Sequence, residues 1–363
     1  MTQANAVWAL GLMSGTSMDG VDGAMVLTDG VEVFEFGATG FRPYSADERA
    51  VIAAAQGCWP TDKGVAEAEE TVRQAHSELI TRFGGVELVG FHGQTLAHDP
   101  GGRGTHQVGD GAQLARQIGI PVVWDFRSND VASGGQGAPL APFYHFALAK
   151  RLGEGAAAFL NLGGVGNVTF ANPLGGEPEV VGAILAFDTG PANALMDDFV
   201  KARTGLACDY GGALAAGGQV DGTVISAFLG GEYFSRTPPK SLDRNDFAEL
   251  STAVQTMSDM DGLATLAAAT IASVRYAFEY APKGLGRVLV CGGGRKNDHL
   301  MAGLRSALKI KVEDVTAAGF DGDMLEAQAF AYLAVRSKAG LPLSASGSTG
   351  VKTPLTGGVL SAP

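Results

Sequence analysis

The sequence predicts an α/β protein of two domains, and three observations lead to this prediction. The chain has 363 residues, a length that is too great for one ordinary core and sufficient for two domains, and 46% of the residues are apolar. Segments with the pattern of buried strands alternate with helical segments, an order typical of parallel strand pairing. An apolar strand, a glycine-rich turn and a second apolar strand occur twice, at residues 6–27 and 157–173. We therefore expect two halves that share one architecture.

The first half contains the opening hairpin, a helical region and two further strands. The hairpin strands are expected at residues 6–12 and 21–27, and the strand pattern continues over 30–41. Residues 45–83 have a helical pattern that begins with Ser45 and Glu48, a spacing suited to a capping box. A buried strand that ends in a polar turn (86–98), a short helix (111–119) and another buried strand (120–126) follow.

The second half begins after residues 127–145, a segment rich in glycine and proline. We interpret this segment as a functional loop and a junction between domains. The hairpin at 157–173 comes next. The remaining expected segments are strand, turn and amphipathic helix (182–202), a loop (209–222), helical structure (246–280), strand, glycine loop and helix (286–304), a mostly apolar helix (321–338) and a surface tail (344–363).

Charge and cysteine content exclude several classes of protein. The formal net charge is −12 and no basic cluster occurs, so the electrostatic footprint of a nucleic-acid-binding protein is absent. No apolar run reaches the roughly 20 residues that span a bilayer, and the first residues lack the positive region of a signal peptide. The three cysteines lie far apart and form no CxxC pair, which indicates a reducing compartment, the cytoplasm.

Three glycine-rich turns follow apolar strands, at residues 15–20, 163–166 and 292–294. Such turns expose backbone N–H groups that suit a phosphate, because no Cβ blocks its approach. None is a Walker A loop or a GxGxxG fingerprint, and each alone is compatible with a purely structural turn. Two such turns that face each other across a cleft could clamp a polyphosphate.

The first turn also carries hydroxyl and carboxylate groups. Its hydroxyl donors are Ser14, Thr16 and Ser17. Asp19 and Asp22 could hold Mg²⁺, a cation that prefers oxygen ligands. The alternative for Asp19 is an Asx-type bond with its own backbone.

Asp188 follows a buried strand, in the segment FDTGPAN. Active-site groups of α/β proteins lie at this end of a strand, so Asp188 is a candidate general base. The alternative is a helix N-cap, although Pro191 is a better helix start.

Polar side chains follow two strands of the first half, in HGQT (92–95) and DFRSND (125–130). They mix donors and acceptors, and Arg127 could hold a carboxylate of a ligand with two hydrogen bonds. The alternatives are a buried structural histidine at His92 and an ion pair of Arg127 with Asp125 or Asp130.

Six motifs resemble those of the anhydro-N-acetylmuramic acid kinases, in the order of that family and over nearly the whole chain. They are GLMSGTSMDGVD, FHGQT, DFRSNDVASGGQGAPL, NLGGVGNVT, FDTGPAN and VLVCGGGRKN. The resemblance implies an α/β, two-lobed actin-like ATPase (ribonuclease H-like) fold, each lobe a mixed sheet flanked by helices, with ATP in the cleft between the lobes. We expect an N-terminal lobe of residues 1–135, completed by the tail 350–363, and a C-terminal lobe of residues 136–349.

The same resemblance implies a role for each motif. Asp188 would be the catalytic base and Asp19 a ligand of Mg²⁺. ATP would contact Gly15, Thr16, Ser17, Met18, Asp19, Gly20, Val21, Asp22, Gly163, Gly164, Asn167, Gly292, Gly293 and Gly294. The amino sugar would contact His92, Gln94, Asp125, Arg127, Asn193 and Glu326. We also expect a homodimer. One departure is that the family usually reads GPGN after the aspartate, whereas Ala192 replaces the second glycine here, which would strain a turn that needs positive φ.

The reaction implied is phosphorylation of 1,6-anhydro-N-acetylmuramic acid with opening of its anhydro ring, a step of peptidoglycan recycling. Asp188 would deprotonate a water that attacks the anomeric carbon, and the released O6 would take the γ-phosphate of ATP. Two alternatives remain open. One is a sugar kinase of the same fold that acts on a free hydroxyl, and the other is a nucleotide-binding module without catalysis.

Overall fold

The chain forms two compact units, each of which is described by itself. The computed structural model describes residues 5–242 and 244–363. Unit 1 comprises residues 1–151, 177–184 and 324–363, and unit 2 comprises residues 152–176 and 185–323.

Unit 1 is built on a seven-stranded sheet with the order β12-β6-β4-β1-β2-β3, in which β5 pairs with β4. Its strands are β1 (Val7–Ser14), β2 (Gly20–Thr28), β3 (Val33–Pro43), β4 (Leu88–Asp99), β5 (Gly104–Val108), β6 (Val122–Trp124) and β12 (Val359–Ser361). Its helices are α1 (Ala46–Ala54), α2 (Val65–Ile80), α3 (Gly111–Ile118), α4 (Ser128–Ala132), α5 (Pro142–Leu152) and α13 (Leu325–Lys338). The predicted capping box of α1 is present, with Ser45 and Glu48 each bonded to the other's backbone N–H.

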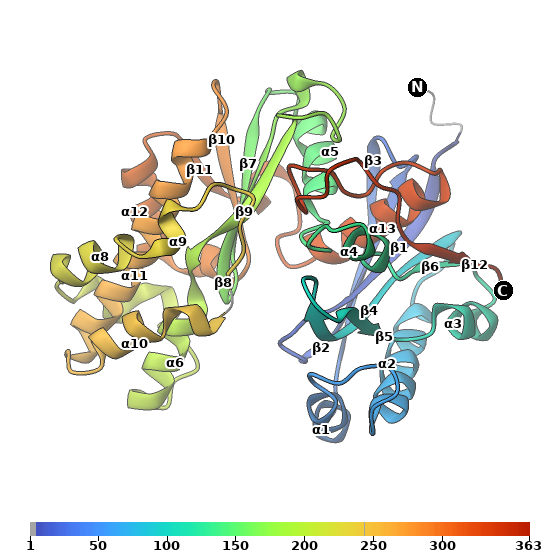
Figure 1. Ribbon diagram of the computed structural model, residues 1–363, viewed down its shortest axis with the longest axis horizontal. Helices are drawn as coiled ribbons and strands as arrows, with labels where there is room; N and C mark the ends of the chain where they lie inside the picture. The colour runs from blue at the N-terminus through green and yellow to red at the C-terminus, as the bar shows by residue number, and fades with distance from the viewer. Residues whose placement is uncertain (1–4, 243) are drawn as a thin grey trace. The chain divides into compact units, whose positions relative to one another are not determined.

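The sheet of unit 1 is covered on both faces. Leu10 and Leu12 of β1 belong to the core on the side of α2, where Val72 and Leu79 lie. Side chains alternate across a strand, so Gly11 faces the other side, and there a Cβ would collide with the backbone of Ala327 on α13. Small residues on β1 thus let α13 lie directly against the sheet, as Figure 1 shows.

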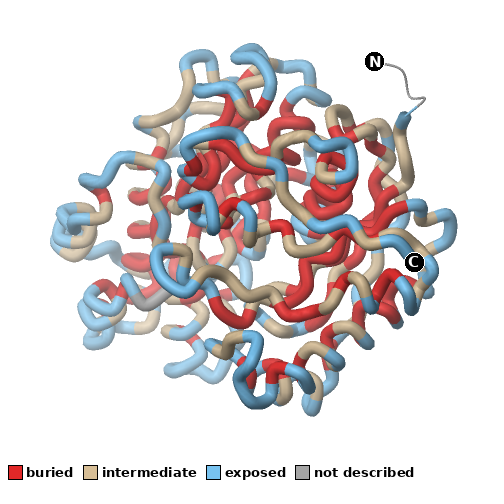
Figure 2. The backbone as a smooth tube through the Cα atoms, turned by 45° about the vertical axis from the view of Figure 1, so that its right-hand side comes forward, coloured by how far each residue is buried: buried red, intermediate tan, exposed pale blue. Residues whose placement is uncertain are grey.

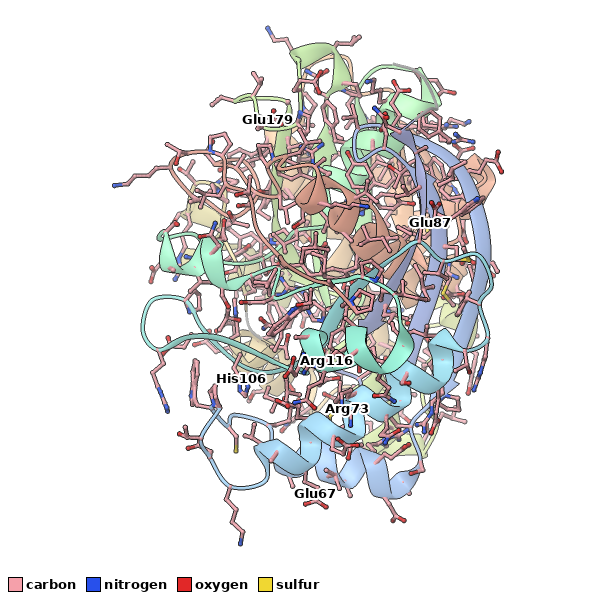
Figure 3. All side chains as sticks on the ribbon, turned by 90° about the vertical axis from the view of Figure 1, so that its right-hand side faces the viewer. Glu67, Arg73, Glu87, His106, Arg116 and Glu179 are labelled. Carbon is pink, nitrogen blue, oxygen red and sulfur yellow. The ribbon has the colours of Figure 1, made fainter. Side chains whose placement is uncertain are left out.

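Arg336 links α13 to two distant parts of unit 1. It is buried and donates hydrogen bonds to the carbonyls of Gly30 and Pro342, both at 2.8 Å. It also forms an ion pair with Glu179 at 3.6 Å, which connects the segment 177–184 to this unit (Figure 3).

Unit 2 is built on a five-stranded sheet with the order β11-β10-β7-β8-β9. Its strands are β7 (Ala157–Leu162), β8 (Val165–Ala171), β9 (Ile184–Pro191), β10 (Arg287–Cys291) and β11 (Lys311–Asp314). Its α-helices are α6 (Asn193–Thr204), α7 (Ala213–Ala216), α8 (Gly222–Leu229), α9 (Glu232–Ser235), α10 (Ala248–Val254), α11 (Asp259–Ala277) and α12 (Asp298–Leu308). Figure 2 colours the backbone by burial, with buried segments in red and exposed segments in pale blue.

Both sheets have the same topology. In unit 1, β1 and β2 form an antiparallel hairpin, β4 pairs in parallel with the other side of β1, and β6 pairs in parallel with β4. In unit 2, β7 and β8 form the hairpin, β10 pairs in parallel with the other side of β7, and β11 pairs in parallel with β10. The third strand lies outside the second in both sheets. This repetition confirms the predicted fold class, a mixed sheet flanked by helices in each half.

Three segments that were expected in the C-terminal lobe belong to unit 1, namely residues 136–151, 177–184 and 324–349. Residues 136–151 and 324–349 do so because α5 and α13 pack together there through the hydrogen bond from Tyr144 to Gln328, at 2.9 Å. The tail lies in unit 1, where its strand β12 pairs with β6. Among the described residues, no helix has the length and apolarity needed to cross a bilayer.

Candidate active site

The first glycine turn, residues 15–19, joins β1 to β2 in unit 1. Thr16, Ser17 and Asp19 are exposed, and Met18 has a left-handed backbone with φ 52°. Asp19 accepts the hydroxyl of Ser17 at 2.6 Å, a contact between side chains. The other predicted residues, Gly20, Val21 and Asp22, lie in β2. The turn itself therefore presents hydroxyls and one carboxylate to solvent.

The second turn, in unit 2, is shorter and is held by a helix. Gly163 and Gly164 connect β7 to β8, and Asn167 lies within β8. The N–H of Asn193 donates to the carbonyl of Gly163 at 2.8 Å, and its side-chain amide donates to Leu162, also at 2.8 Å. Asn193 is thus bonded to this turn, where the positive end of the α6 dipole also lies.

Glycine at three turn positions is not required by packing. A Cβ on Gly15, Gly163 or Gly164 would meet its nearest neighbour at 3.6–3.7 Å, an ordinary contact, and none of the three has a left-handed backbone. Their bare backbone is therefore available for a ligand that approaches closely.

The third glycine segment meets the second turn. Gly292 has φ 72°, and a Cβ there would collide with the amide oxygen of Asn161. A Cβ on Gly293 would lie 3.1 Å from Nδ2 of Asn193, and one on Gly294 would lie 2.5 Å from Cβ of Leu162. Unit 2 thus brings these glycines, Asn193 and the second turn into one group.

Asp188 lies within β9, which continues to Pro191, rather than at the end of a strand as expected. The N-cap alternative is wrong, because α6 begins at Asn193 and Ala192 is its N-cap residue. Ala192 has φ −132°, so the exchange of glycine for alanine causes no positive-φ strain.

A segment of unit 2 that sequence reasoning missed holds Asp188. The N–H of Leu242 donates to Oδ2 at 2.8 Å, the N–H of Asp188 donates to the carbonyl of Lys240 at 3.0 Å, and the hydroxyl of Tyr233 donates to the carbonyl of Asp188. Oδ1 has no hydrogen-bond partner in the described part of the chain. Burial raises the pKa of Asp188 to about 6, and the Leu242 N–H opposes this rise. A carboxylate with one free oxygen and this pKa suits a general base near neutral pH.

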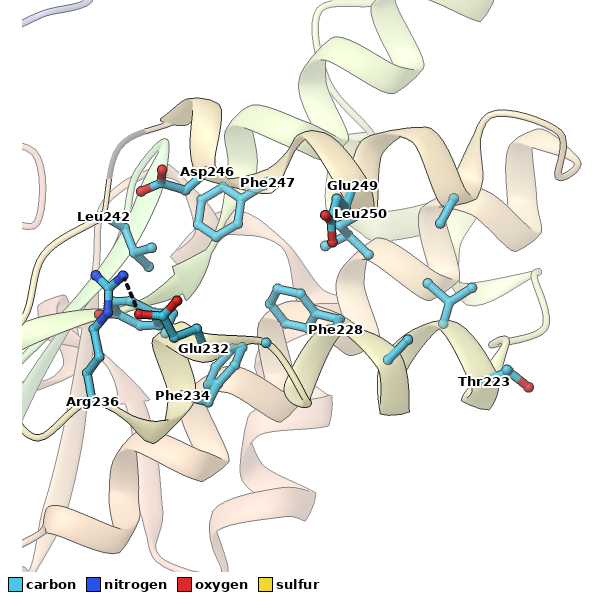
Figure 4. A pocket seen from close by; sticks show the side chains of 15 residues that line it. Thr223, Phe228, Glu232, Phe234, Arg236, Leu242, Asp246, Phe247, Glu249 and Leu250 are labelled. Atoms are coloured by element: carbon cyan, nitrogen blue, oxygen red, sulfur yellow. Dashed lines mark hydrogen bonds and ion pairs between the residues drawn. The ribbon is translucent and has the colours of Figure 1, made fainter.

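A pocket of about 500 Å³ lies beside this segment. Its walls include Phe228, Phe234 and Phe247, and Tyr233 and Leu242 also line it (Figure 4). Leu242 therefore contributes its N–H to Asp188 and also lines the pocket.

HGQT lies inside β4 and not after it, which corrects the expected polar turn. The β1–β4 register gains one residue on β4 between Phe91 and Gln94, and Gly93 in this bulge has φ 71°. Gln94 is fully buried, accepts the Ser14 hydroxyl at 2.5 Å and donates to the Gly15 carbonyl at 3.2 Å. In unit 1, Gln94 therefore supports the first turn.

His92 is buried, with Nδ1 2.8 Å from the Gly93 carbonyl and Nε2 within hydrogen-bond distance of Arg127. Burial, and then the charge of Arg127, hold the pKa of His92 well below its usual value. The imidazole is thus neutral, and both of its nitrogens are engaged.

Arg127 has no ion pair among the described residues, contrary to the structural alternative. Asp130 instead accepts the N–H of Gly137 and the hydroxyl of Thr349, each at 2.7 Å. Asp125, which has φ 52°, accepts the hydroxyl of Ser128 at 2.5 Å. Burial lowers the pKa of Arg127 to about 10, while the charge of Glu326 opposes this shift, so the guanidinium stays charged. A half-buried cation that forms no ion pair in the described part of the chain favours an anionic ligand.

The remaining predicted residue, Glu326, lies exposed in the first turn of α13. In the described residues, no three His, Cys, Asp or Glu side chains are grouped so that they could hold a metal ion. A Mg²⁺ ion near Asp19 would therefore need further coordinating oxygens from the ligand that the protein binds.

Comparison with known proteins agrees with the resemblance of the motifs. The family model described as anhydro-N-acetylmuramic acid kinase matches residues 7–362. A protein of that name from Cereibacter sphaeroides is 59% identical over 100% of this chain and 98% of its own length. Another from Ruegeria is 54% identical over 100% of this chain and 97% of its own length.

The chain also resembles solved structures of low sequence identity. An activator of 2-hydroxyisocaproyl-CoA dehydratase from Clostridium difficile, with bound ADPNP, has a TM-score of 0.44 and 10% identity over 92% of this chain and 96% of its own. This likeness is too weak to carry an assignment. The family model and the relatives extend over nearly the whole chain, and on these two findings the chain belongs to the anhydro-N-acetylmuramic acid kinase family.

Proposed function

We propose that this chain is an ATP-dependent kinase that converts 1,6-anhydro-N-acetylmuramic acid and water into N-acetylmuramic acid 6-phosphate. Membership of the family over nearly the whole chain supports this reaction. The observation that carries it is Asp188, whose carboxylate is fixed through Oδ2, whose Oδ1 has no partner among the described residues, and whose pKa is about 6.

Asp188 acts as the general base. Oδ1 takes a proton from a water molecule, and the water oxygen bonds to the anomeric carbon as the bond from that carbon to O6 breaks. O6 then bonds to the γ-phosphorus of ATP as ADP leaves, and Asp188 releases its proton to solvent. General-base catalysis of this kind contributes about 10²–10⁴-fold.

The glycine turns bind ATP. The bare backbone at Gly15, Gly163 and Gly164 supports phosphate contacts, since glycine is not needed there for packing. Asp19 is an exposed carboxylate that fits Mg²⁺, because this ion commonly takes one or two carboxylates together with phosphate oxygens and water. When bound, Mg²⁺ would offset the charge of the transferring phosphoryl group.

Arg127 binds the carboxylate of the lactyl group of the sugar. Its lack of an ion pair supports this role, as does the left-handed backbone of Asp125 at the same turn. Asp125, Asn193 and Glu326 remain predicted sugar contacts.

We place the enzyme in the cytoplasm, where peptidoglycan recycling would supply its substrate, and its three free cysteines suit a reducing compartment. The homodimer stays a prediction, which sedimentation equilibrium would check.

Reaction in ¹⁸O-labelled water tests the proposal and separates it from its alternatives. We expect one ¹⁸O atom at C1 of the 6-phosphate product, beyond the label that unlabelled product acquires by exchange over the same time. A phosphorylated product without this label, or with an intact anhydro ring, would indicate a kinase that acts on a free hydroxyl. ATP turnover that does not respond to any sugar would favour the module without sugar kinase activity.

A further inference from the structure

We propose that His92 is a positioning residue, which sets the orientation of Arg127 and thereby the preference for a sugar that bears a carboxylate. This inference rests on the proposed function. It replaces the direct sugar contact expected for His92 with an indirect role.

The hydrogen bonds determine the state of the imidazole. Nε2 of His92 lies 3.1 Å from Nε and 2.9 Å from Nη2 of Arg127. A guanidinium can only donate, so Nε2 must accept, and the ring proton must lie on Nδ1, which donates to the Gly93 carbonyl at 2.8 Å. No nitrogen of the ring is then left for the sugar.

The guanidinium is held from three sides. His92 accepts from Nε and Nη2, and the carbonyl of Gly137 accepts from Nη1 at 2.7 Å. The ring of Phe330 on α13 lies beneath both groups, 4.6 Å from the imidazole centroid and 6.0 Å from Cζ of Arg127. Three of the five N–H groups are thus used, and the other two, one on each terminal nitrogen, remain for a ligand.

The sheet explains why these residues meet. Phe91 of β4 pairs with Trp124 of β6 in parallel, so His92 and Asp125 follow at neighbouring positions. The bulge at His92 and Gly93 and the left-handed backbone of Asp125 redirect the two chains at this point. Arg127 then begins α4 beside the imidazole. A preorganised fork recognises a planar carboxylate better than a mobile cation does.

His92→Phe tests the inference, because phenylalanine keeps a flat ring against Phe330 but has no acceptor. Kinetics are measured with 1,6-anhydro-N-acetylmuramic acid and with 1,6-anhydro-N-acetylglucosamine, which lacks the lactyl carboxylate. We expect kcat/KM for the first sugar to fall about tenfold or more, mainly through KM, and to change less than about threefold for the second. His92→Gln retains an acceptor and should recover part of the loss.

A matched control is available in the same unit. His76 is a buried histidine of α2, with Nδ1 2.7 Å from the Val72 carbonyl and no contact with Arg127. His76→Phe should leave the ratio of the two kcat/KM values unchanged, whatever it does to stability.

Imidazole ¹⁵N spectra of the wild-type protein give a second readout if His92→Phe fails to fold. We expect His92 to be neutral at pH 7, with its proton on Nδ1, as the hydrogen bonds to Arg127 and Gly93 require. A His92 that carries its proton on Nε2, or equal losses on both sugars in a folded His92→Phe variant, would overturn the inference. Failure of the proposed function would instead appear in the wild-type enzyme, as absence of turnover with either sugar.

Discussion

The two sheets have the same strand order, but the turns of their first hairpins are built differently. The turn of unit 1 is exposed and carries its own hydroxyls and Asp19, and Gln94 supports it from β4. The turn of unit 2 has two glycines and depends on Asn193 and the start of α6. A repeated topology therefore places two similar backbones, while the elements that follow each hairpin supply the chemistry.

The proposed general base lies in unit 2, and unit 1 has no equivalent proposed residue. We therefore expect the largest effect on activity from Asp188→Asn. The amide keeps the shape and the bond from Leu242 but cannot take a proton, so kcat should fall at least about 10²–10⁴-fold. Binding of ATP, measured by calorimetry, should change little. Thermal unfolding of the variant should show that it is folded, because removal of a half-buried charge does not favour the unfolded state. Substantial turnover in that variant would contradict the assignment.

Valine at Gly15 and at Gly164 tests what the two turns have in common. Both positions have room for a Cβ in the free protein, so stability should be preserved while KM for Mg·ATP rises about tenfold or more in each variant. Gly292→Ala is the contrasting case, because positive φ and the collision with Asn161 should lower stability by about 1–3 kcal/mol. A rise in only the sugar KM would mean that a turn is misassigned.

The pH dependence of kcat should report the base in unit 2 and not the cation in unit 1. The pKa of Asp188 is raised to about 6, so the active, deprotonated form is present above this pH and is lost as pH falls. We expect kcat to decrease about tenfold for each pH unit well below 6. The same raised pKa means that the stability contributed by protonated Asp188 is lost as pH rises through about 6. A pH–rate profile that is flat from 5 to 8 would argue against Asp188.

Asp19→Ala tests the difference between the turns, since the second turn has no counterpart to this carboxylate. KM for Mg·ATP and the Mg²⁺ concentration for half activity should rise by roughly three- to tenfold, as expected for one exposed metal-side carboxylate. Titration of Mg²⁺ at fixed ATP measures this. No change in the Mg²⁺ requirement would remove Asp19 from the metal site.

The smallest effect is expected for Ala192→Gly, which restores the residue common in the family. Ala192 is buried and its φ is negative, at −132°, so glycine is not needed here for a left-handed backbone and should lower stability by at most about 1 kcal/mol. kcat should stay within about twofold. An increase of tenfold would show that alanine limits the turn after Asp188.

The repeated hairpins and most elements could be predicted because they depend on local pattern. Strand, glycine turn and strand occur twice in the sequence, and the capping box of Ser45 and Glu48 marks the start of α1. The role of His92 could not be predicted in this way. It depends on a bulge in β4 and on the approach of Arg127 from another strand, and neither has a local signal.

The support of Asp188 was also beyond sequence reasoning. Tyr233 and Leu242 lie 45 and 54 residues further along the chain, and the prolines between them indicate only a segment that is not helical. Long-range contacts of this kind follow from tertiary packing, which propensity and periodicity do not describe.

The arrangement of unit 1 along the chain has a consequence for biosynthesis. Unit 2 is inserted between parts of unit 1, whose sheet is covered by α13 and extended by β12, both from the last 40 residues, 324–363. A ribosome that has made residues 1–323 has therefore produced all of unit 2 but leaves one apolar sheet face of unit 1 without its helix. Domains generally fold as units during synthesis, so unit 2 can acquire its structure before unit 1. The nascent chain would expose Gly11 and its neighbours on β1 during that interval, a surface that chaperones can bind.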